Sequence, residues 1–204
     1  MITRAWCARD APVVAVELLN KVLVSRSGGH VVRGRITETE AYTADDPASH
    51  TFNGQTERNA VMFGPAGVLY VYLSYGIHHC ANVVTGTEGD GQAVLIRAVE
   101  PVEGLDTIRK RRGGRRDAEL TDGPGKGGQA FGLDVSTSGS DLIQGNPIQG
   151  DPIQSIPESN GDRLVWLTDD GVAPPPEPIV GPRIGISKAV ERPWRFRVPR
   201  SRTV

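Results

Sequence analysis

Two β-like runs separated by a pair of glycines set the strongest limit on how this chain can fold. They make up residues 21–42, "KVLVSRSGGHVVRGRITETEAY". Valine, isoleucine and threonine are typical of strands, and "SGG" between the runs is typical of a tight turn. The segment therefore predicts a β-hairpin whose second strand ends in the acidic sequence "ETEAY".

The rest of the chain mixes helical and strand patterns. Residues 10–20 predict a short helix that Asp10 caps and Pro12 opens. Other segments predict further strands at 69–82, 92–102, 163–171 and 181–187, a helix at 102–112, and a glycine-rich turn that enters a short helix at 129–133. Because strands and helices do not alternate, we expect an α+β fold, as a single domain over residues 1–204.

The composition is ordinary for a globular protein and predicts no membrane span. Of its 204 residues 38% are hydrophobic and 23% charged, and no apolar run approaches the ~18 residues of a membrane span. Asp10, Pro12 and Glu17 interrupt the region where a signal peptide is apolar, so we expect a cytoplasmic protein, associated with the nucleoid if its source is bacterial. The two cysteines, Cys7 and Cys80, are expected to be buried or free thiols.

A direct repeat stands apart from these patterns. "GNPIQGDPIQ" occupies residues 145–154 and is rich in proline, glycine and glutamine. This composition predicts a flexible loop at about 139–162, to which we assign no function.

Charge is unevenly distributed although the net charge is only −1. Residues 109–116, "RKRRGGRR", are basic, and residues 192–204 hold five arginines and no carboxylate, whereas "ETEAYTADD" is acidic. Two interpretations remain open: two solvated basic surfaces, or a phosphate-facing side opposite an acidic catalytic pocket.

Alternation along the second strand puts Glu38, Glu40 and Tyr42 on one face. A carboxylate beside an aromatic ring could activate a water next to a stacked planar ligand. The alternative is a strand edge that merely faces solvent.

The segment 69–82, "LYVYLSYGIHHCAN", holds three of the four tyrosines and two of the four histidines. Tyrosines in such a strand are often core residues whose hydroxyls have found partners. Tyr75, however, lies beside Gly76 at the expected tip of a hairpin, where its ring would project into solvent unless something receives it.

Metal and phosphate chemistry receive little support. His78 and His79 are neighbours on a strand and point to opposite faces, so they cannot share a zinc site with Cys80 without distortion. "GPGKGG" at 123–128 could offer backbone amides and Lys126 to a phosphate, but it lacks the spacing of a nucleotide-binding P-loop. We expect neither a metal nor a cofactor.

Several separate motifs, in one order, resemble the alkyladenine (3-methyladenine) DNA glycosylase family. They are "RITETEAY", a later His50, "RNAVMFGPAGVLYVYLSYGIHHCANVV", "AVLIRAVEP", "GPGK" and "GPRIGIS…RPWRF", and the likeness runs from about residue 12 to residue 198. The segments near 109–118 and 139–163 match weakly. The resemblance implies a curved, mixed and largely antiparallel β-sheet with surrounding helices and a protruding β-hairpin that inserts into DNA.

The resemblance also implies an activity. The family's members are monofunctional base-excision enzymes that flip a damaged purine out of duplex DNA and hydrolyse its N-glycosidic bond, leaving an abasic site. The expected partner is therefore duplex DNA containing damaged purines, bound by a monomer. A strand-cleaving lyase would need an amine nucleophile, which the matched pocket positions lack.

Roles carry over to matching positions of this sequence. Glu40 matches the general base that deprotonates the attacking water, and Arg97 matches the arginine that helps to hold that water. The residues that match those contacting the flipped base are Tyr42, His50, Tyr72 and Asn82, the last of which crowds the exocyclic amino group of guanine. Tyr75 matches the side chain that wedges into the gap in the duplex, and Lys126 and Arg58 are candidate phosphate contacts.

Physical chemistry supports these assignments. Flipping costs a few kcal/mol, least at a damaged base, and a wedge restores part of the lost stacking. Alkylation at N3 or N7 makes a purine cationic, so an aromatic sandwich favours it by ~1–2 kcal/mol and its glycosidic bond breaks more easily. Positioning and deprotonating one water is then enough.

A parity argument constrains the hairpin. A two-residue turn at Tyr75 and Gly76 would pair Tyr72 with His79 and send Asn82 to the opposite face. The resemblance implies that Tyr72 and Asn82 line one pocket, so we predict a three-residue loop or a bulge between residues 74 and 82.

Two other functions remain open on the sequence. One is a non-catalytic module that binds damaged or distorted duplex DNA, and the other is a small hydrolase of free nucleosides. Glu40 separates the first from a glycosylase, and the salt dependence of activity on duplex DNA separates the second.

Overall fold

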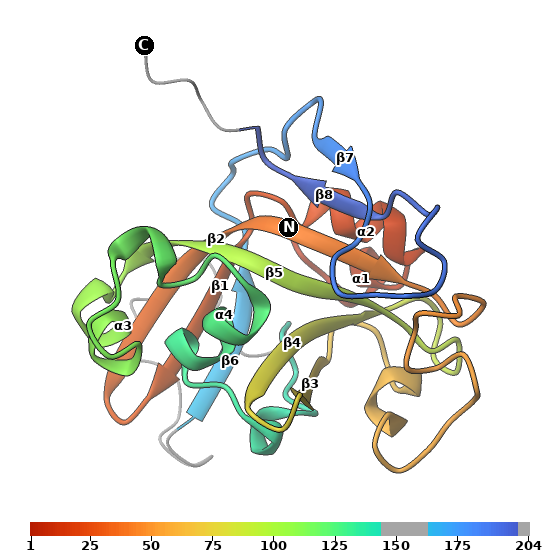
Figure 1. Cartoon of the computed structure of the whole chain (residues 1–204), viewed down its shortest axis with the longest axis horizontal. Helices are drawn as coiled ribbons and strands as arrows, with labels where there is room; N and C mark the ends of the chain where they lie inside the picture. Colours follow the sequence, from red (N-terminus) through yellow and green to blue (C-terminus); the bar gives the residue numbers. More distant parts are fainter. Residues whose placement is uncertain (144–162, 200–204) are drawn as a thin grey trace.

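A computed structural model describes residues 1–143 and 163–199 of the chain. The predicted loop at 139–162, with its repeat, lies outside the described residues from 144 onward. Helices and short 3-10 turns surround a curled sheet (Figure 1). The helical elements are α1 Arg4–Cys7, α2 Ala11–Glu17, η1 Ala60–Phe63, α3 Leu105–Arg111, η2 Asp117–Glu119, α4 Pro124–Phe131 and η3 Val135–Thr137.

The sheet has eight strands among the described residues, and every pairing within it is antiparallel. The strands are β1 Val22–Ser27, β2 His30–Tyr42, β3 Leu69–Ser74, β4 His78–Thr85, β5 Gln92–Glu103, β6 Arg163–Thr168, β7 Ile179–Gly181 and β8 Arg195–Arg197. Their order is β3-β4-β5-β2-β1-β6, with β8 beside β2 and β7 beside β8. The predicted α+β class and curved sheet are confirmed.

β2 is the spine of this sheet. One of its edges pairs with β5, while the other pairs first with β1 and then, at Glu38–Glu40, with β8. The β2–β5 register shifts three times, between Arg33 and Gly34 and on both sides of Glu38. Because bulges bend a strand and increase its twist, these irregularities curl the sheet at the position that carries Glu40.

The predicted hairpin at 21–42 is confirmed, with Gly28 and Gly29 at positive φ in its turn. The hairpin of β3 and β4 has the predicted irregularity too. Ser74 pairs with His78, so three residues form the loop, and Tyr72 then pairs with Cys80 and Tyr70 with Asn82. Tyr72 and Asn82 therefore share a face.

Two predictions about later segments are wrong. Most of the glycine-rich turn predicted before residue 129 is in fact helical, because α4 begins at Pro124 rather than near Gln129. Its glycines permit close packing, because a Cβ on Gly128 would lie 2.0 Å from the backbone oxygen of His79. Residues 182–187 form no strand, and β7 ends at Gly181. The pattern was ambiguous because short apolar runs bounded by glycine occur in loops as well.

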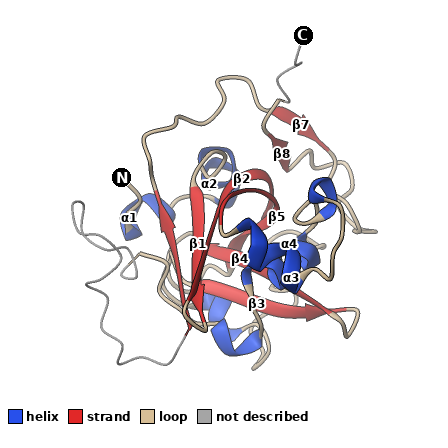
Figure 2. Ribbon diagram, turned by 90° about the vertical axis from the view of Figure 1, so that its left-hand side faces the viewer, coloured by secondary structure: helices blue, strands red, loops and turns tan. Residues whose placement is uncertain are grey.

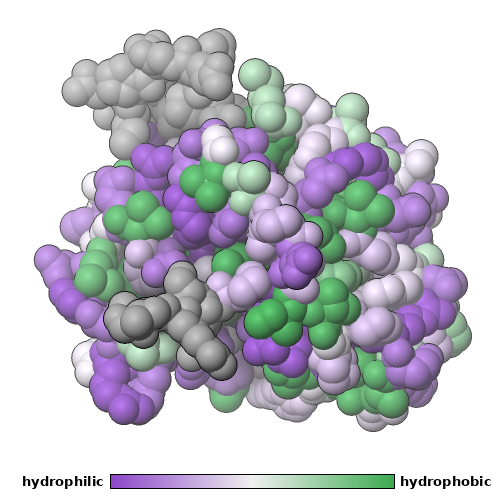
Figure 3. Space-filling model, turned by 90° about the horizontal axis from the view of Figure 1, so that it is seen from above, coloured by the Kyte–Doolittle hydropathy of each residue, from purple (hydrophilic) through white to green (hydrophobic). Residues whose placement is uncertain are grey.

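Most buried apolar side chains belong to one continuous core under the curled sheet. It joins α1 and α2 to α3 and α4 through side chains such as Leu18, Ile36, Ile108 and Phe131. Figure 2 shows α3 and α4 side by side, and both α4 and α2 pack against the sheet. The face drawn in Figure 3 mixes polar with scattered apolar side chains.

Among the described residues no helix is long and apolar enough to cross a membrane. Asp10 occupies the predicted cap position of α2, but its side chain makes no capping hydrogen bond, whereas Pro12 lies in the first turn as expected. Cys7 and Cys80 are both buried and unpaired, which confirms the expectation for the thiols.

Candidate active site

A cavity of about 410 Å³ lies where the end of β2, the β3–β4 hairpin and β5 converge. The loop at 48–58, the first residue of α4 and the segment 184–186 complete its wall. The wall contains most of the predicted site residues: Tyr42, His50, Arg58, Tyr72, Tyr75, Asn82 and Arg97. Residues far apart in the sequence are thus brought together at one end of the sheet.

Glu40 lies immediately behind this wall and has no exposed surface. Its Oε2 accepts a hydrogen bond from the Tyr42 hydroxyl at 2.8 Å, and its Oε1 accepts one from the backbone N–H of Ile184 at 2.8 Å. The Arg97 guanidinium is 3.2 Å from the same Oε1. Three donors from three segments therefore orient the carboxylate, and the two side chains among them line the cavity.

Arg97 is held on the strand next to Glu40. Its Nε donates to Glu38 Oε1 at 3.2 Å, and Arg195 of β8 donates to that same oxygen at 3.2 Å. Glu38 and Glu40 share a face of β2, as alternation predicts, and Arg97 bridges them. The group is a mixed-charge network, so the pocket is not simply acidic as one interpretation of the sequence expected.

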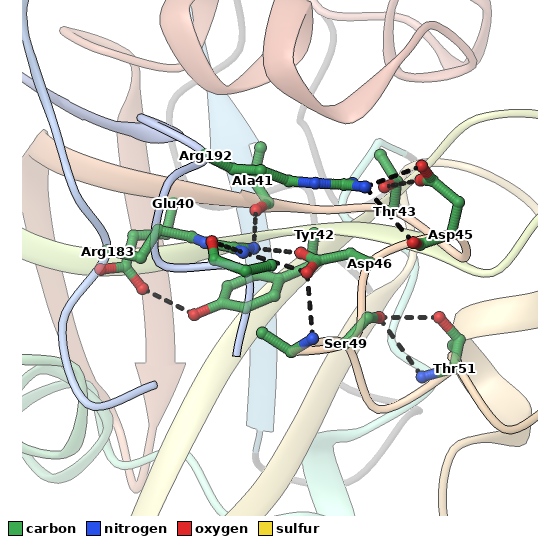
Figure 4. Close-up of polar contacts among 12 residues, drawn as sticks. Glu40, Ala41, Tyr42, Thr43, Asp45, Asp46, Ser49, Thr51, Arg183 and Arg192 are labelled. Atoms are coloured by element: carbon green, nitrogen blue, oxygen red, sulfur yellow. Dashed lines mark hydrogen bonds and ion pairs between the residues drawn. The ribbon is translucent and has the colours of Figure 1, made fainter. Parts of the chain in front are cut away.

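Tyr42 is held at its hydroxyl and at the face of its ring (Figure 4). Its hydroxyl points at Glu40, while the Arg183 guanidinium lies over its ring, 4.6 Å from the centroid. Burial, and then the nearby Glu40 carboxylate, raise the pKa of Tyr42 far above its ordinary value. The phenol consequently stays protonated and serves as a hydrogen-bond donor.

An aromatic cluster forms the opposite wall. The His50 ring lies edge-on to Tyr72 with 4.5 Å between centroids, and its Nδ1 is 3.1 Å from the Tyr70 hydroxyl. His50 is partly exposed, but the protein around it removes water that would solvate the charged imidazolium. This loss of solvation, and secondly repulsion from Arg58, lower the pKa of the imidazole. Tyr70 is buried and stacks on Tyr72 at 5.8 Å, so it supports the wall.

Asn82 and Cys80 lie on the hairpin face that borders the cavity. The Asn82 amide nitrogen donates to the backbone oxygens of Tyr70 and Cys80, at 3.1 and 3.4 Å. Because both acceptors are carbonyls, the side-chain oxygen of Asn82 is the end left for a ligand. Burial raises the pKa of the Cys80 thiol, which makes it unreactive at neutral pH.

Tyr75 occupies the tip of the hairpin and is 86% exposed. Both Tyr75 and Gly76 have positive φ, at 50° and 71°, and Ile77 N–H closes the turn on the Ser74 carbonyl at 3.1 Å. Ile77 is 72% exposed as well. The tip thus carries two large apolar side chains that contact little of the protein.

The two candidate phosphate contacts differ in availability. Arg58 is exposed on the cavity wall, where its guanidinium makes a long hydrogen bond of 3.3 Å to the Leu73 carbonyl. Lys126 in α4 is outside the wall, and its ammonium pairs with Asp122 at 2.7 Å. A phosphate would have to displace that carboxylate to reach Lys126.

Much of the basic cluster at 109–116 is engaged within the protein. Arg109 pairs with Asp106 and Asp117, and Arg116 pairs with Glu119. The cluster is therefore less positive than its sequence suggests. Among the described residues no group of three or more histidines, cysteines or carboxylates is placed to hold a metal ion.

Sequence reasoning missed three contributors to the site. Arg183 and Asp46 form an ion pair whose side chains have no exposed surface, and Ile184 supplies a backbone donor to Glu40. A backbone N–H donor cannot be predicted from residue type, because every residue except proline has one. "GPRIGIS" did contain a lone arginine among apolar residues, which is the one signal that could have indicated a buried charge.

Comparison with known proteins identifies the family of this chain. A family model described as methylpurine-DNA glycosylase matches residues 5–202. A protein of Carboxydothermus hydrogenoformans is 41% identical over all of this chain and 98% of its own length. One of Methanoculleus marisnigri is 45% identical over 98% of this chain and 96% of its own, and one of Burkholderia lata is 45% identical over 100% and 90%.

All three relatives are named as proposed 3-methyladenine DNA glycosylases. The family model covers nearly the whole chain, and each relative exceeds 40% identity over at least 90% of its own length. Such likeness spans the sheet, the hairpin and the segment that supplies Arg183 and Ile184. The chain therefore belongs to the methylpurine-DNA glycosylase family, whose members are hydrolases of N-glycosyl bonds.

Proposed function

We propose that this enzyme is a monofunctional glycosylase of base-excision repair, which flips a damaged purine out of duplex DNA and hydrolyses its N-glycosidic bond. The observation that carries the proposal is the Glu40 carboxylate, held by Tyr42, Arg97 and the Ile184 N–H directly behind an aromatic cavity. An abasic site is the product. The likeness to proteins named for 3-methyladenine supports alkylated purines as substrates.

Glu40 acts as the general base in this mechanism. The attacking water is bound at Arg97, and its proton passes to the carboxylate as the oxygen attacks C1′ of the flipped nucleotide. The C1′–N bond breaks in the same step, and the purine leaves with its bonding electrons. A positioned base of this kind contributes about 10²–10⁴-fold in rate. Among the described residues that line the cavity there is no lysine, which supports hydrolysis without strand cleavage.

Tyr42, His50 and Tyr72 bind the flipped base. Their rings supply the electron-rich faces that attract a cationic purine, by about 0.5–2 kcal/mol per contact. The lowered pKa of His50 keeps its imidazole neutral near pH 7, so it adds no repulsion against such a base. The wall therefore suits alkylated purines and still accepts neutral planar lesions.

Asn82 rejects guanine by crowding. Its amide is anchored to two backbone carbonyls, so it cannot rotate away from a purine that carries an extra exocyclic amino group. Undamaged guanine then fits poorly, and exclusion depends on a clash rather than on a better contact with the substrate.

The hairpin tip enters the duplex. Tyr75 fills the space that the flipped nucleotide leaves, and stacking of its ring offsets part of the cost of flipping. Arg58, at the cavity wall, contacts a phosphate beside the lesion, and Lys126 does so after exchanging its Asp122 contact. The enzyme acts as a monomer on duplex DNA.

Base release from synthetic duplexes tests the proposal. Duplexes that carry 3-methyladenine, hypoxanthine or ethenoadenine are incubated with wild type, Glu40→Gln and Tyr75→Ala, and free base is separated from DNA. We expect Glu40→Gln to lose about 10²–10⁴-fold in single-turnover rate while still binding duplex with an abasic-site analogue. Tyr75→Ala is expected to fold normally, because the side chain is exposed, but to bind that duplex more weakly.

The outcomes separate the open alternatives. Binding without base release by wild type would identify a non-catalytic module. Release by Glu40→Gln at the wild-type rate would refute Glu40 as the base. Release from free nucleosides at a rate equal to that from duplex DNA would indicate a nucleoside hydrolase.

A further inference from the structure

Arg183 and Asp46 form a fully buried ion pair directly behind Tyr42. Two guanidinium nitrogens of Arg183 face the two carboxylate oxygens of Asp46, one of them at 3.0 Å. The same guanidinium donates to the Ala41 carbonyl at 3.0 Å and to the Ala189 carbonyl at 3.3 Å. Figure 4 shows this bidentate pair beside the Tyr42 ring.

The guanidinium lies on the side of Tyr42 that faces away from the cavity. Tyr42 lines the cavity whereas Arg183 does not, and the Arg183 carbon Cζ is 4.6 Å from the ring centroid. Arg183 Nε is buried without a hydrogen-bond partner in the described part of the chain. The guanidinium therefore contacts the Tyr42 ring while its terminal nitrogens bind Asp46 and two backbone carbonyls.

This position places a permanent cation on one face of a ring whose other face receives the flipped base. A base stacked on Tyr42 at roughly 3.5 Å lies roughly 8 Å from the guanidinium. A cationic base is repelled at that separation, whereas a neutral base is not. An unbalanced unit charge there, at an effective dielectric constant of about 20, would disfavour a cationic base by more than about tenfold.

Asp46 supplies the balancing charge. Its carboxylate is within hydrogen-bonding distance of the guanidinium and, like it, is inaccessible to water. The pair is nearly neutral as seen from the cavity, so the Tyr42 face keeps its attraction for a cation. A neutral apolar side chain behind Tyr42 would have served packing alone without needing Asp46.

We propose that Asp46 determines specificity in this enzyme: by neutralising Arg183 behind Tyr42, it allows the pocket to accept cationic alkylated purines as well as neutral damaged ones. The inference rests on the proposed function, since it concerns the base that Tyr42 receives. Asp46 and Arg183 touch neither the base nor the reacting atoms. They act through Tyr42.

The readout is a ratio measured on a single preparation. Single-turnover release of 3-methyladenine, which is cationic in DNA, is divided by release of hypoxanthine, which is neutral, after subtraction of enzyme-free depurination. Asp46→Asn keeps the size of the side chain and leaves Arg183 unbalanced. We expect it to lower the ratio by about tenfold, and the ratio does not depend on the folded fraction.

Two further variants make the test specific. The double variant Asp46→Asn/Arg183→Met removes both charges and keeps most of the volume. Because the pair is nearly neutral as seen from the cavity, removal of both charges is expected to return the ratio close to its wild-type value. Asp169→Asn breaks the distant ion pair of Asp169 with the largely buried Lys21, and is expected to leave the ratio unchanged.

If Asp46→Asn lowers the rates of release of 3-methyladenine and hypoxanthine by the same factor, the ion pair only stabilises the fold. That result would overturn the inference. A double-variant ratio that stays as low as that of Asp46→Asn would overturn the inference as well, because removal of Arg183 should restore it. If Asp46→Asn yields no folded protein, Asp46→Ser, which also removes the charge, is measured in its place with the same expected and contradicting results. Failure of wild type to release either base would instead refute the proposed function. The two failures are therefore distinguishable.

Discussion

At the scale of the residue, the site depends on how each polar group is held. Alternation along β2 predicted that Glu40 and Tyr42 share a face, and the 2.8 Å contact between them confirms it. The third donor to Glu40 is the backbone N–H of Ile184, 144 residues away in sequence. A carboxylate held in this way keeps one orientation while the substrate binds.

His50 makes the clearest prediction about pH. Its pKa in the folded protein lies below the ordinary value of 6.5, chiefly through burial and also through Arg58. Below pH 6.5 the unfolded chain therefore binds a proton more readily than the folded protein does. The stability that the protein has with His50 neutral is fully present above pH 6.5. It is lost as the pH falls through the pKa of His50 in the folded protein.

Titration of the His50 ring signals by NMR checks the cause. We expect a midpoint below 6.5 in wild type and an upward shift in Arg58→Gln, because the guanidinium no longer repels the imidazolium. Arg26 pairs with Val31 at the opposite end of β2, so Arg26→Gln is a matched control that is expected to change nothing. A midpoint unaffected by Arg58→Gln would leave burial as the whole cause.

At the scale of the element, the contact between α4 and β4 positions the hairpin. A Cβ at Gly128 would lie 2.0 Å from the His79 backbone oxygen and one at Gly125 2.6 Å from His78 Cβ, whereas one at Gly127 would meet nothing within 4 Å. Only small residues at the first two positions let the helix approach the strand this closely. Pro124, which begins the helix, then reaches the cavity.

Two glycine substitutions in α4 test this packing. Gly128→Ala is expected to lower the free energy of unfolding by about 1–3 kcal/mol, since a backbone oxygen cannot move aside cheaply. Gly127→Ala is expected to raise it by up to about 1 kcal/mol, since alanine favours helix and nothing obstructs its methyl group. Urea denaturation measures both, and equal stability of the two variants would contradict the close contact.

At the scale of the whole molecule, charge is distributed so that DNA binding cannot depend on net charge. The chain carries a net charge of −1, and Arg109 and Arg116 are paired within the protein. We therefore expect contacts to phosphates to come from local cations, and we propose Arg58 at the cavity wall as one of them. Each phosphate contact contributes about −0.9 to the slope of log K against log salt.

Salt dependence measures that number of contacts. We expect the affinity for duplex with an abasic-site analogue to fall as salt rises from 50 to 200 mM, with a slope that becomes shallower by about one unit in Arg58→Gln. Fluorescence anisotropy at several salt concentrations gives the slope. A slope near zero for wild type would contradict binding through phosphates.

Much of the fold could be predicted from local patterns. Strand alternation and turn glycines identified the 21–42 hairpin, and the apolar run at 92–102 identified β5, because these signals depend only on neighbours in sequence. Parity, combined with the shared pocket that the resemblance implies for Tyr72 and Asn82, predicted a three-residue loop or a bulge, and the structure has the loop. The start of α4 was missed because glycine is a weak helix former, and only packing against His78 and His79 makes glycine suitable there.

The sequence by itself determined the strand pattern, the family resemblance and a set of candidate site residues, most of which line the cavity. Tertiary structure alone decided that Glu40 is covered, that Ile184 donates to it, and that Arg183 with Asp46 stands behind Tyr42. The physical reason is range. Periodicity and turn chemistry act over a few residues, whereas burial and charge balance arise only when segments more than a hundred residues apart are brought into contact.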